Sequence, residues 1–159
     1  MGISLKIVKE EDWDFVLDLR NEKNFRKYFQ NQKHIEKNEH YEYLNKQKNN
    51  PNFFNWIICD NSDDVGYVRI LDNDVSIMIK PSHHGKGIGT MVLSHLLKYG
   101  FKKLHLHRIS AEVIEYNENS IHLFEKSKFK TDAIFREVIW RNNQWWNIKS
   151  MSILKEDFK

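Results

Sequence analysis

The residues that most clearly suggest chemistry are three glycines, Gly85, Gly87 and Gly89, which alternate within five positions of "HHGKGIGT". The chain of 159 residues has only six glycines, so this one segment holds half of them. An alternating, strand-like run ends before it at Pro81, and apolar residues at helical spacing follow it. Glycines let a backbone turn sharply and approach a ligand, and the free N–H groups of a first helical turn bind anions. The spacing therefore predicts a phosphate-binding loop between a strand and a helix.

Two common glycine-rich phosphate loops do not match this one. The dinucleotide-binding pattern is G-x-G-x-x-G, whereas the spacing here is G-x-G-x-G. The P-loop needs a closing Gly-Lys-Ser/Thr, which does not occur here. A glycine loop that serves only to turn the chain is the alternative explanation.

Two stretches together resemble one protein superfamily. The segment "HGKGIG", residues 84–89, resembles the coenzyme A pyrophosphate loop of the GNAT superfamily of N-acetyltransferases. That pattern is Gln/Arg-x-x-Gly-x-Gly/Ala, and His84 takes its first place here. The stretch "AEVIEYNENSIHLFEKSKF" resembles the next strand and helix of the superfamily, with matches at Asn117, Ile121, Leu123, Lys126 and Phe129. Both matches lie at the distance that the family shows and cover about residues 75–129, so the chain is identified as a member.

The resemblance implies that acetyl-CoA is the cofactor. The backbone of residues 77–79 would pair with the pantetheine arm, the glycine loop would hold the pyrophosphate, and Asn117 would lie near the reactive end. The residues assigned to the cofactor are Ile77, Met78, Ile79, His84, Gly85, Lys86, Gly87, Ile88, Gly89, Thr90, Asn117 and Phe124.

Acetyl transfer to an amine requires a base, because an ordinary amine is mostly protonated at neutral pH. Some members of the family use a glutamate five places before the Asn, and that position is Glu112 here. Glu115, close by in the sequence, is the alternative base. Either glutamate could instead have no catalytic role and be a solvent-facing strand residue that pairs with Lys or Arg. Glu112, Glu115 and Asn117 are therefore the candidate catalytic residues.

The usual general acid of the family is a tyrosine, and this chain has Phe124 in its place. A thiol with a pKa near 8.5 is a tolerable leaving group, so the reaction does not strictly need an acid. Tyr116 and Tyr67 are possible substitutes, and nothing in the sequence favours either. A second departure is Lys128, where the family usually has a glycine that ends the helix.

The acceptor is expected to contact the N-terminal helices and the closing hairpin. The stretch "LRNEKNFRKYFQNQKHIEKNEHYEYL" resembles a subgroup that includes the UDP-amino-sugar N-acetyltransferase of the pseudaminic-acid pathway and, more loosely, ribosomal-protein N-acetyltransferases. The matching positions are Arg20, Asn21, Arg26 and His40. Trp140, Trp145 and Trp146 in the hairpin would suit a sugar face or a uracil ring.

An amine on a nucleotide-linked sugar is therefore the first expectation for the acceptor. Protein N-termini, another small amine, or an inactive GNAT-fold binding module are the alternatives. Cys59 could suggest an acyl-enzyme, but its place in the apolar run "NWIICDN" favours a buried thiol.

Composition and charge limit the kinds of partner, metal site and cellular location that the protein can have. The net charge of +3 comes from scattered basic residues, which argues against a nucleic-acid partner but suits an anionic small molecule. No apolar run is long enough for a membrane span, the N-terminus lacks the apolar core of a signal peptide, and the eight histidines show no metal-ligand spacing. We expect a cytoplasmic enzyme without a metal, and a homodimer is left open.

The elements that must position these residues alternate irregularly. Strands are expected at residues 3–8, 53–60, 65–71, 74–80, 109–114, 129–140 and 144–154, and helices at residues 10–19, 21–31, 36–48, 88–101 and 120–127. This order predicts an α/β protein with the GNAT acyl-CoA N-acyltransferase fold, a mixed and largely antiparallel central sheet flanked by helices. No linker interrupts it, so residues 1–159 are expected to form a single domain.

Overall fold

The computed structural model describes residues 2–159 and divides the chain into two compact units, Met1–Ile88 and Gly89–Lys159. That these units together make one domain stays a prediction. Within residues 2–159, no helix combines the length and the apolar character that a membrane-spanning segment needs.

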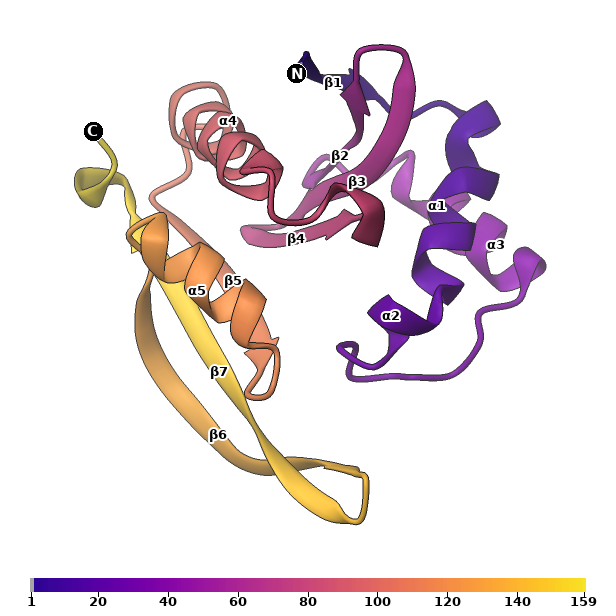
Figure 1. Ribbon diagram of the computed structural model, residues 1–159. Coiled ribbons are helices and arrows are strands. Elements are labelled where there is room, and N and C mark those ends of the chain that lie inside the picture. The colour runs from indigo at the N-terminus through magenta and orange to yellow at the C-terminus, as the bar shows by residue number, and fades with distance from the viewer. Residues whose placement is uncertain (1) are drawn as a thin grey trace. The chain divides into compact units, whose positions relative to one another are not determined.

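The first unit holds four strands and three helices (Figure 1). The strands are β1 (Ile3–Ile7), β2 (Phe53–Asp60), β3 (Asp63–Leu71) and β4 (Asp74–Ile79), and the helices are α1 (Trp13–Asn21), α2 (Lys23–Arg26) and α3 (Lys37–Gln47). The strands pair in chain order, each antiparallel to the next. Asn61 and Asp72 adopt left-handed backbone torsions in the two tight turns, with φ of 57° and 58°. Both residue types tolerate that torsion, so local chemistry sets these hairpins.

The core of the first unit lies between α1 and one face of this sheet. Val16 and Leu19 of α1 and Phe25 of α2 pack on alternate residues of β2 and β3, which point to the same face. The sheet residues of this cluster are Ile57, Cys59, Tyr67 and Met78. Cys59 is 7% exposed within it, which confirms the predicted buried thiol.

The helix expected at residues 21–31 is much shorter in the structure. Only α2 forms, and of its four residues Phe25 alone is buried. A short polar helix has little stability without an apolar face to bury. Side chains bind the backbone instead: Asn31 Oδ1 accepts from the Lys33 N–H at 3.0 Å, and Arg26 Nε donates to the Gln32 carbonyl at 3.0 Å. Local side-chain hydrogen bonds of this kind compete with helix formation.

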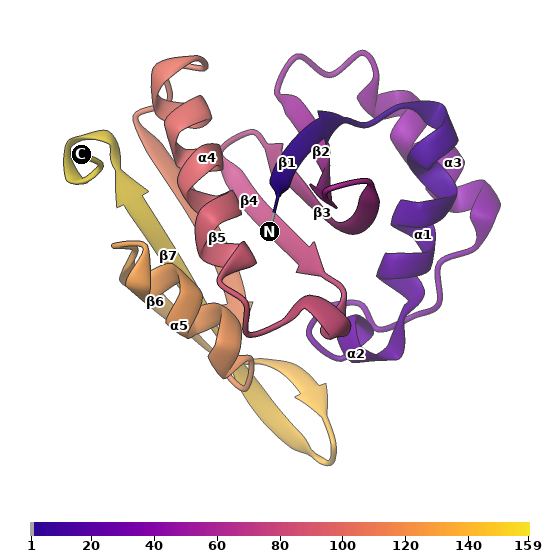
Figure 2. The same cartoon turned by 45° about the horizontal axis from the view of Figure 1, so that its top comes forward.

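The second unit holds two helices and three strands (Figure 2). They are α4 (Ile88–Lys102), β5 (Arg108–Ile114), α5 (Glu118–Lys126), β6 (Lys130–Arg141) and β7 (Gln144–Leu154). β7 lies between β5 and β6 and is antiparallel to both. Asn142 and Asn143 join β6 to β7 with φ of 53° and 60°, as in a two-residue hairpin turn with left-handed torsions at both positions.

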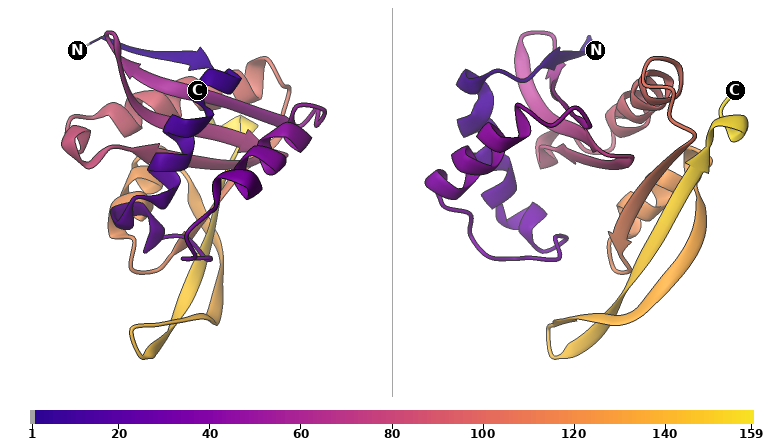
Figure 3. Two further views of the ribbon diagram at one scale, coloured as in Figure 1. Left: turned by 90° about the vertical axis from the view of Figure 1, so that its right-hand side faces the viewer. Right: turned by 180° about the vertical axis from the view of Figure 1, so that it is seen from behind.

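The β6–β7 hairpin extends beyond β5 and α5 (Figure 3). Its pairing is interrupted between Phe135 and Ile139, where residues 136–138 face Asn147 alone. Glu137 has φ of 53°, and its N–H donates to Asn147 Oδ1 at 2.9 Å. The strand expected at residues 129–140 forms as β6, and a bulge interrupts its pairing with β7 where one asparagine side chain replaces a backbone partner.

Candidate active site

The glycine loop has the geometry that the sequence predicts for a ligand-binding turn. Gly85 and Gly87 have φ of 75° and 78°, torsions that a residue with a side chain rarely adopts. A Cβ atom built on either glycine meets no protein atom within 4 Å. The loop therefore leaves open space beside its backbone at the start of α4, and that it holds the cofactor's diphosphate there stays a prediction.

His84, which takes the place of the family's Gln or Arg, binds the end of β4. Its Nε2 lies 2.6 Å from the Ile79 carbonyl oxygen. A carbonyl can only accept a hydrogen bond, so Nε2 carries the proton. The His84 ring also lies edge-on to Phe25, with 6.4 Å between ring centroids. His84 thus holds the loop against the strand that precedes it.

β4 carries the residues expected to pair with the pantetheine arm. Ile77 and Ile79 are half-buried and Met78 is buried, and the three residues pair with Val68, Tyr67 and Gly66 of β3. A Cβ on Gly66 would lie 2.4 Å from the Met78 carbonyl oxygen, closer than real contacts allow. Gly66 is therefore needed for the close approach of β3 and β4. Sequence reasoning missed Gly66, although a lone glycine inside a strand pattern often marks such an approach.

Glu112 and Glu115 belong to the second unit and differ in setting. Glu112 is an exposed residue of β5 that pairs with Ser150 of β7, between the buried Ala111 and Val113. Glu115 lies just beyond the end of β5, and its N–H donates to the Asn147 carbonyl at 3.0 Å. The sheet therefore fixes the direction of Glu112 more firmly than that of Glu115.

Asn117 begins α5 as its N-cap. Its Oδ1 accepts a hydrogen bond from the Ser120 N–H at 3.3 Å, and its own N–H donates to the Ile114 carbonyl at 2.9 Å. Its side-chain amide nitrogen makes no hydrogen bond within residues 2–159 and is available to a ligand. Asn117 can therefore cap the helix and contact the cofactor together.

Phe124 is buried in the second unit, where it forms part of the end of α5. The Phe129 N–H donates to the Phe124 carbonyl and the Lys128 N–H to the Glu125 carbonyl, at 2.9 and 3.0 Å. The rings of Phe124 and Phe129 pack with centroids 4.9 Å apart. These contacts complete a Schellman motif. Lys128 sits at its left-handed position with φ of 74°, so the turn forms without the glycine that the family uses.

The two tyrosines considered as substitute acids lie in separate units. Tyr67 is buried, and its hydroxyl oxygen accepts from Asn55 Nδ2 at 3.2 Å. Burial raises the pKa of Tyr67, so this hydroxyl keeps its proton more firmly than an ordinary tyrosine. The Tyr116 hydroxyl accepts from Arg141 Nη1 at 3.2 Å.

Two of the four predicted acceptor residues hold helices in place. Asn21 exchanges two hydrogen bonds with the backbone of Ile35, at 2.8 and 2.9 Å. His40 is 3% exposed, and its Nε2 lies 2.9 Å from the Trp13 carbonyl oxygen, so α3 is tied to α1. Burial lowers the pKa of His40, which favours the neutral ring. Both side chains are therefore engaged by the protein's own backbone, and their contact with an acceptor stays a prediction.

The other two predicted acceptor residues, Arg20 and Arg26, are half-buried. Arg26 Nε is used in the hydrogen bond to Gln32. The Arg20 guanidinium lies over the ring of Phe29, 5.4 Å from its centroid.

In the hairpin of the second unit, Trp140 and Trp145 are 56% and 52% exposed. The two rings pack edge to face with centroids 5.4 Å apart. Trp146 is half-buried, and its Nε1 donates to the Arg141 carbonyl at 3.0 Å. Two of the three tryptophans are therefore accessible to a flat ligand.

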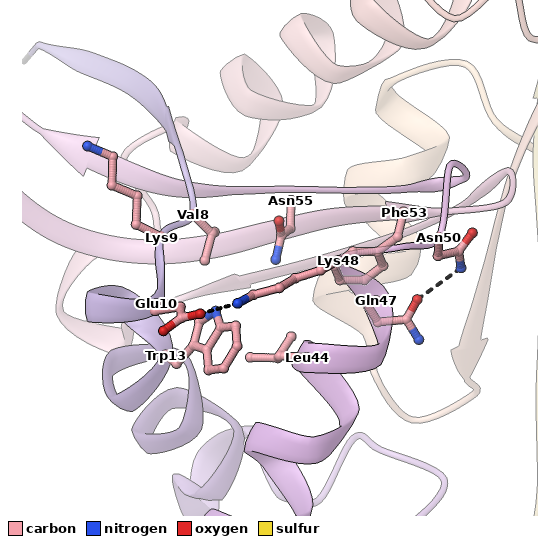
Figure 4. A pocket seen from close by; sticks show the side chains of 10 residues that line it. All are labelled: Val8, Lys9, Glu10, Trp13, Leu44, Gln47, Lys48, Asn50, Phe53 and Asn55. Atoms are coloured by element: carbon pink, nitrogen blue, oxygen red, sulfur yellow. Dashed lines mark hydrogen bonds and ion pairs between the residues drawn. The ribbon is translucent and has the colours of Figure 1, made fainter.

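A separate cavity of about 280 Å³ lies in the first unit (Figure 4). Trp13, Leu44 and Phe53 supply its apolar wall, and Lys48 reaches across to pair with Glu10. The Lys48 ammonium also lies over the Trp13 ring, 5.1 Å from its centroid. None of the predicted site residues lines this cavity. Lys48 and Glu10 neutralise each other there, so the pair leaves no unpaired charge to attract a charged ligand.

Comparison with known proteins identifies the family to which this chain belongs. A family model for the acetyltransferase (GNAT) domain matches residues 3–130. A spermidine N(1)-acetyltransferase of Vibrio cholerae serotype O1 is 24% identical over 164 residues, 98% of this chain and 95% of the relative. The human alpha/beta-tubulin-N-acetyltransferase 9 is 33% identical over 92 residues, 52% of this chain and 44% of that protein.

One solved structure matches almost the whole chain. The crystal structure of spermidine N-acetyltransferase from Vibrio cholerae in complex with CoA and spermine has a TM-score of 0.90 and 25% sequence identity, and the match covers 98% of this chain and 97% of that chain. The predicted fold class and the predicted cofactor are confirmed by these matches. The predicted likeness to an amino-sugar subgroup finds no support among these relatives, which are named for spermidine and tubulin.

Proposed function

Because the chain belongs to the GNAT acetyltransferases and moves an acetyl group from acetyl-CoA to an amine, we propose that its acceptor is an amine on an anionic small molecule. An amino sugar linked to a nucleotide is the first choice. This choice carries forward the resemblance of residues 19–44 to the amino-sugar subgroup.

The observation that carries the proposal is the charge of the segment from the end of α1 to the start of α3. Residues 20–37 contain two acidic residues and six basic ones, namely Arg20, Lys23, Arg26, Lys27, Lys33 and Lys37. A polyamine is a polycation at neutral pH, since amine pKa values lie near 10, and a basic surface repels it. The diphosphate of a nucleotide sugar is attracted to the same surface, and arginine binds phosphate through paired, charge-assisted hydrogen bonds.

The reaction that we propose is direct transfer. Acetyl-CoA, when bound, supplies the acetyl group as a thioester. Glu112 takes a proton from the ammonium, directly or through water, so that the neutral amine attacks the carbonyl carbon. A backbone N–H of β4 stabilises the developing oxyanion, the C–N bond forms and the C–S bond breaks. Phe124 cannot donate a proton, so the thiol leaves as a thiolate, which its pKa near 8.5 permits. The second proton of the attacking nitrogen passes to water as the amide forms.

The test is a comparison of acceptors by release of free thiol from acetyl-CoA. We expect kcat/KM for a UDP-linked or dTDP-linked amino sugar to exceed that of the free amino sugar by about 100-fold or more, because the nucleotide supplies binding energy that is used at the reacting centre. Gly87→Val serves as the control that cannot hold the donor. Equal rates on free and linked sugars, or preference for a peptide N-terminus, would refute the proposal.

A polyamine is the second candidate, because the relative that matches 98% of this chain is a spermidine acetyltransferase. The same assay separates the two acceptors through ionic strength. Added salt should weaken the binding of an anionic acceptor to a basic segment. A kcat/KM for spermidine that exceeds that of every nucleotide sugar would assign the polyamine instead.

A further inference from the structure

We propose that Arg20, Tyr67 and Arg69 form an oxyanion-binding subsite on the helix-covered face of the first unit's sheet, which takes a phosphate or carboxylate group of a small-molecule ligand. The proposal concerns a binding site inside one unit and is separate from the glycine loop. That the ligand is the acetyl acceptor rests on the proposed function, whereas the oxyanion site does not.

The first support is that Arg20 has no anionic partner. Its side chain makes no hydrogen bond and no ion pair within residues 2–159, where it contacts the ring of Phe29 and has Tyr67 and Arg69 as electrostatic neighbours. Glu22 Oε2 is the only enclosed side-chain polar atom without a partner in the same residues. The guanidinium nitrogens of Arg20 are therefore open to solvent at one side, while the rest of the side chain is half-buried.

The second support is the set of neighbours that share this face. Tyr67 and Arg69 are two residues apart on β3, so both point toward the face that packs on α1. Arg69 is flanked across the strands by Asn55 of β2 and Ser76 of β4, which place polar side chains in the same row. The Tyr67 hydroxyl accepts from Asn55 Nδ2 at 3.2 Å, so its own proton is free to be donated.

The third support is an imbalance of charge. Two guanidinium groups, of Arg20 and Arg69, lie close enough to repel each other, and burial together with Arg69 lowers the pKa of Arg20. Asp74 Oδ2 lies 3.6 Å from Arg69 Nη1, so within residues 2–159 Arg69 has a carboxylate partner and Arg20 has none. A partly buried cation without a partner is unfavourable unless an anion joins it.

These groups suit an oxyanion in particular. A guanidinium presents parallel N–H donors that match phosphate and carboxylate oxygens, and the tyrosine adds a neutral donor that its raised pKa keeps protonated. The Phe29 ring packs against the Arg20 guanidinium and restrains that side chain, so less entropy is lost when the ligand binds. The cavity at Trp13 differs from this subsite, because its cation, Lys48, already forms an ion pair with Glu10.

The experiment measures anion binding with the glycine loop already filled. Protein saturated with CoA is titrated by calorimetry with UDP, which supplies a diphosphate, and in a second arm with succinate, which supplies carboxylates. We expect at least one of the two to bind, and Arg20→Met to weaken that binding by at least tenfold. Arg20→Lys should weaken it by an intermediate factor, because the charge remains while the paired donors are lost. Lys46→Met, the matched control, removes one exposed charge from α3, outside the basic segment, and should change affinity less than twofold.

A folding control keeps the result interpretable. Without ligand, Arg20→Met should unfold at a temperature equal to or higher than that of the parent, because it removes a half-buried charge beside Arg69. If the variant is folded and binds UDP and succinate as the parent does, or if the parent binds neither, the subsite is refuted. Loss of anion binding in Arg20→Met with no acetylation of any nucleotide sugar would keep the subsite and refute the proposed acceptor. If Arg20→Met acetylates a nucleotide sugar with an unchanged KM, the proposed acceptor is kept and the subsite is refuted as its binding site.

Discussion

The glycine loop and the C-terminal end of α5 adopt nearly the same left-handed backbone torsion in different surroundings. In the first unit, Gly85 and Gly87 have φ of 75° and 78°. In the second unit, Lys128 at the end of α5 has φ of 74°. The left-handed torsion disfavours a side chain in both places by a similar amount, about 1–2 kcal/mol per residue.

The difference lies in what surrounds the residue. At Lys128 two backbone hydrogen bonds and the packing of Phe124 on Phe129 complete the Schellman motif, and these contacts offset the cost of the lysine torsion. At Gly85 and Gly87 the space for a Cβ is open, so no protein atom excludes a side chain there. A positive φ therefore does not by itself require glycine. We infer that the loop glycines keep space for the cofactor, whereas Lys128 shows what the fold alone tolerates.

The strongest test of this comparison is Gly87→Val. The valine side chain would occupy the open space, and we expect affinity for CoA to fall by about 100-fold, or about 2.7 kcal/mol, while the protein stays folded. Calorimetry of CoA binding measures the loss, and thermal unfolding checks the fold. If Gly87→Val bound CoA as tightly as the parent, the glycines would serve only the turn and the cofactor would bind elsewhere.

The second unit carries the expected chemistry, so a variant there should separate catalysis from cofactor binding. Glu112→Gln should lower kcat by about 100-fold, as is typical of a lost general base, and leave CoA affinity unchanged. In the parent, kcat/KM should rise with pH to a plateau and show no falling limb near a tyrosine pKa of about 10, because Phe124 replaces the usual acid. Glu115→Gln is the matched control. If it lowered kcat instead, the base would be Glu115.

Gly66→Ala tests a glycine that is required by contact rather than torsion. The new Cβ would lie 2.4 Å from the Met78 carbonyl oxygen, so β3 and β4 must separate. We expect the free energy of unfolding to fall by about 2–3 kcal/mol. Gly85→Ala is the control, because it meets no atom and should cost about 1 kcal/mol from torsion alone. Equal losses in urea unfolding would show that β3 and β4 adjust without cost.

The smallest change, one in stability, is expected at Lys128, the residue compared with the loop glycines. Lys128→Gly should raise the free energy of unfolding by about 1 kcal/mol, because glycine adopts the left-handed torsion without strain. Urea unfolding measures the gain, and CoA affinity should not change. His122→Gly, at an exposed position in the interior of α5, should lose about 1 kcal/mol as glycine does inside a helix. A loss of stability in Lys128→Gly would mean that the lysine side chain contributes more than its torsion costs.

Much of the fold follows from patterns that are local in the chain. The alternation in β2 and β3, the helical stripe of Val92 and Leu96 in α4 and the asparagine pair of the last hairpin all lie where periodicity and turn chemistry predict them. The segment at residues 21–31 shows the limit of such reasoning. Helical composition there is defeated by side chains that hydrogen-bond to the backbone of later residues, and no window of sequence shows such contacts.

The sequence by itself determined the family, the turn of the glycine loop and the cap of α5, because each depends on residues that are neighbours in the chain. Only the tertiary structure decided which polar side chains have partners. His40 and Asn21 match a substrate motif by type, yet in the structure they bind the backbone of α1 and of Ile35. Arg20 matches the same motif by type, but only folding places it near Arg69 without a carboxylate partner. The physical reason is that hydrogen bonding and desolvation depend on distances between residues far apart in sequence.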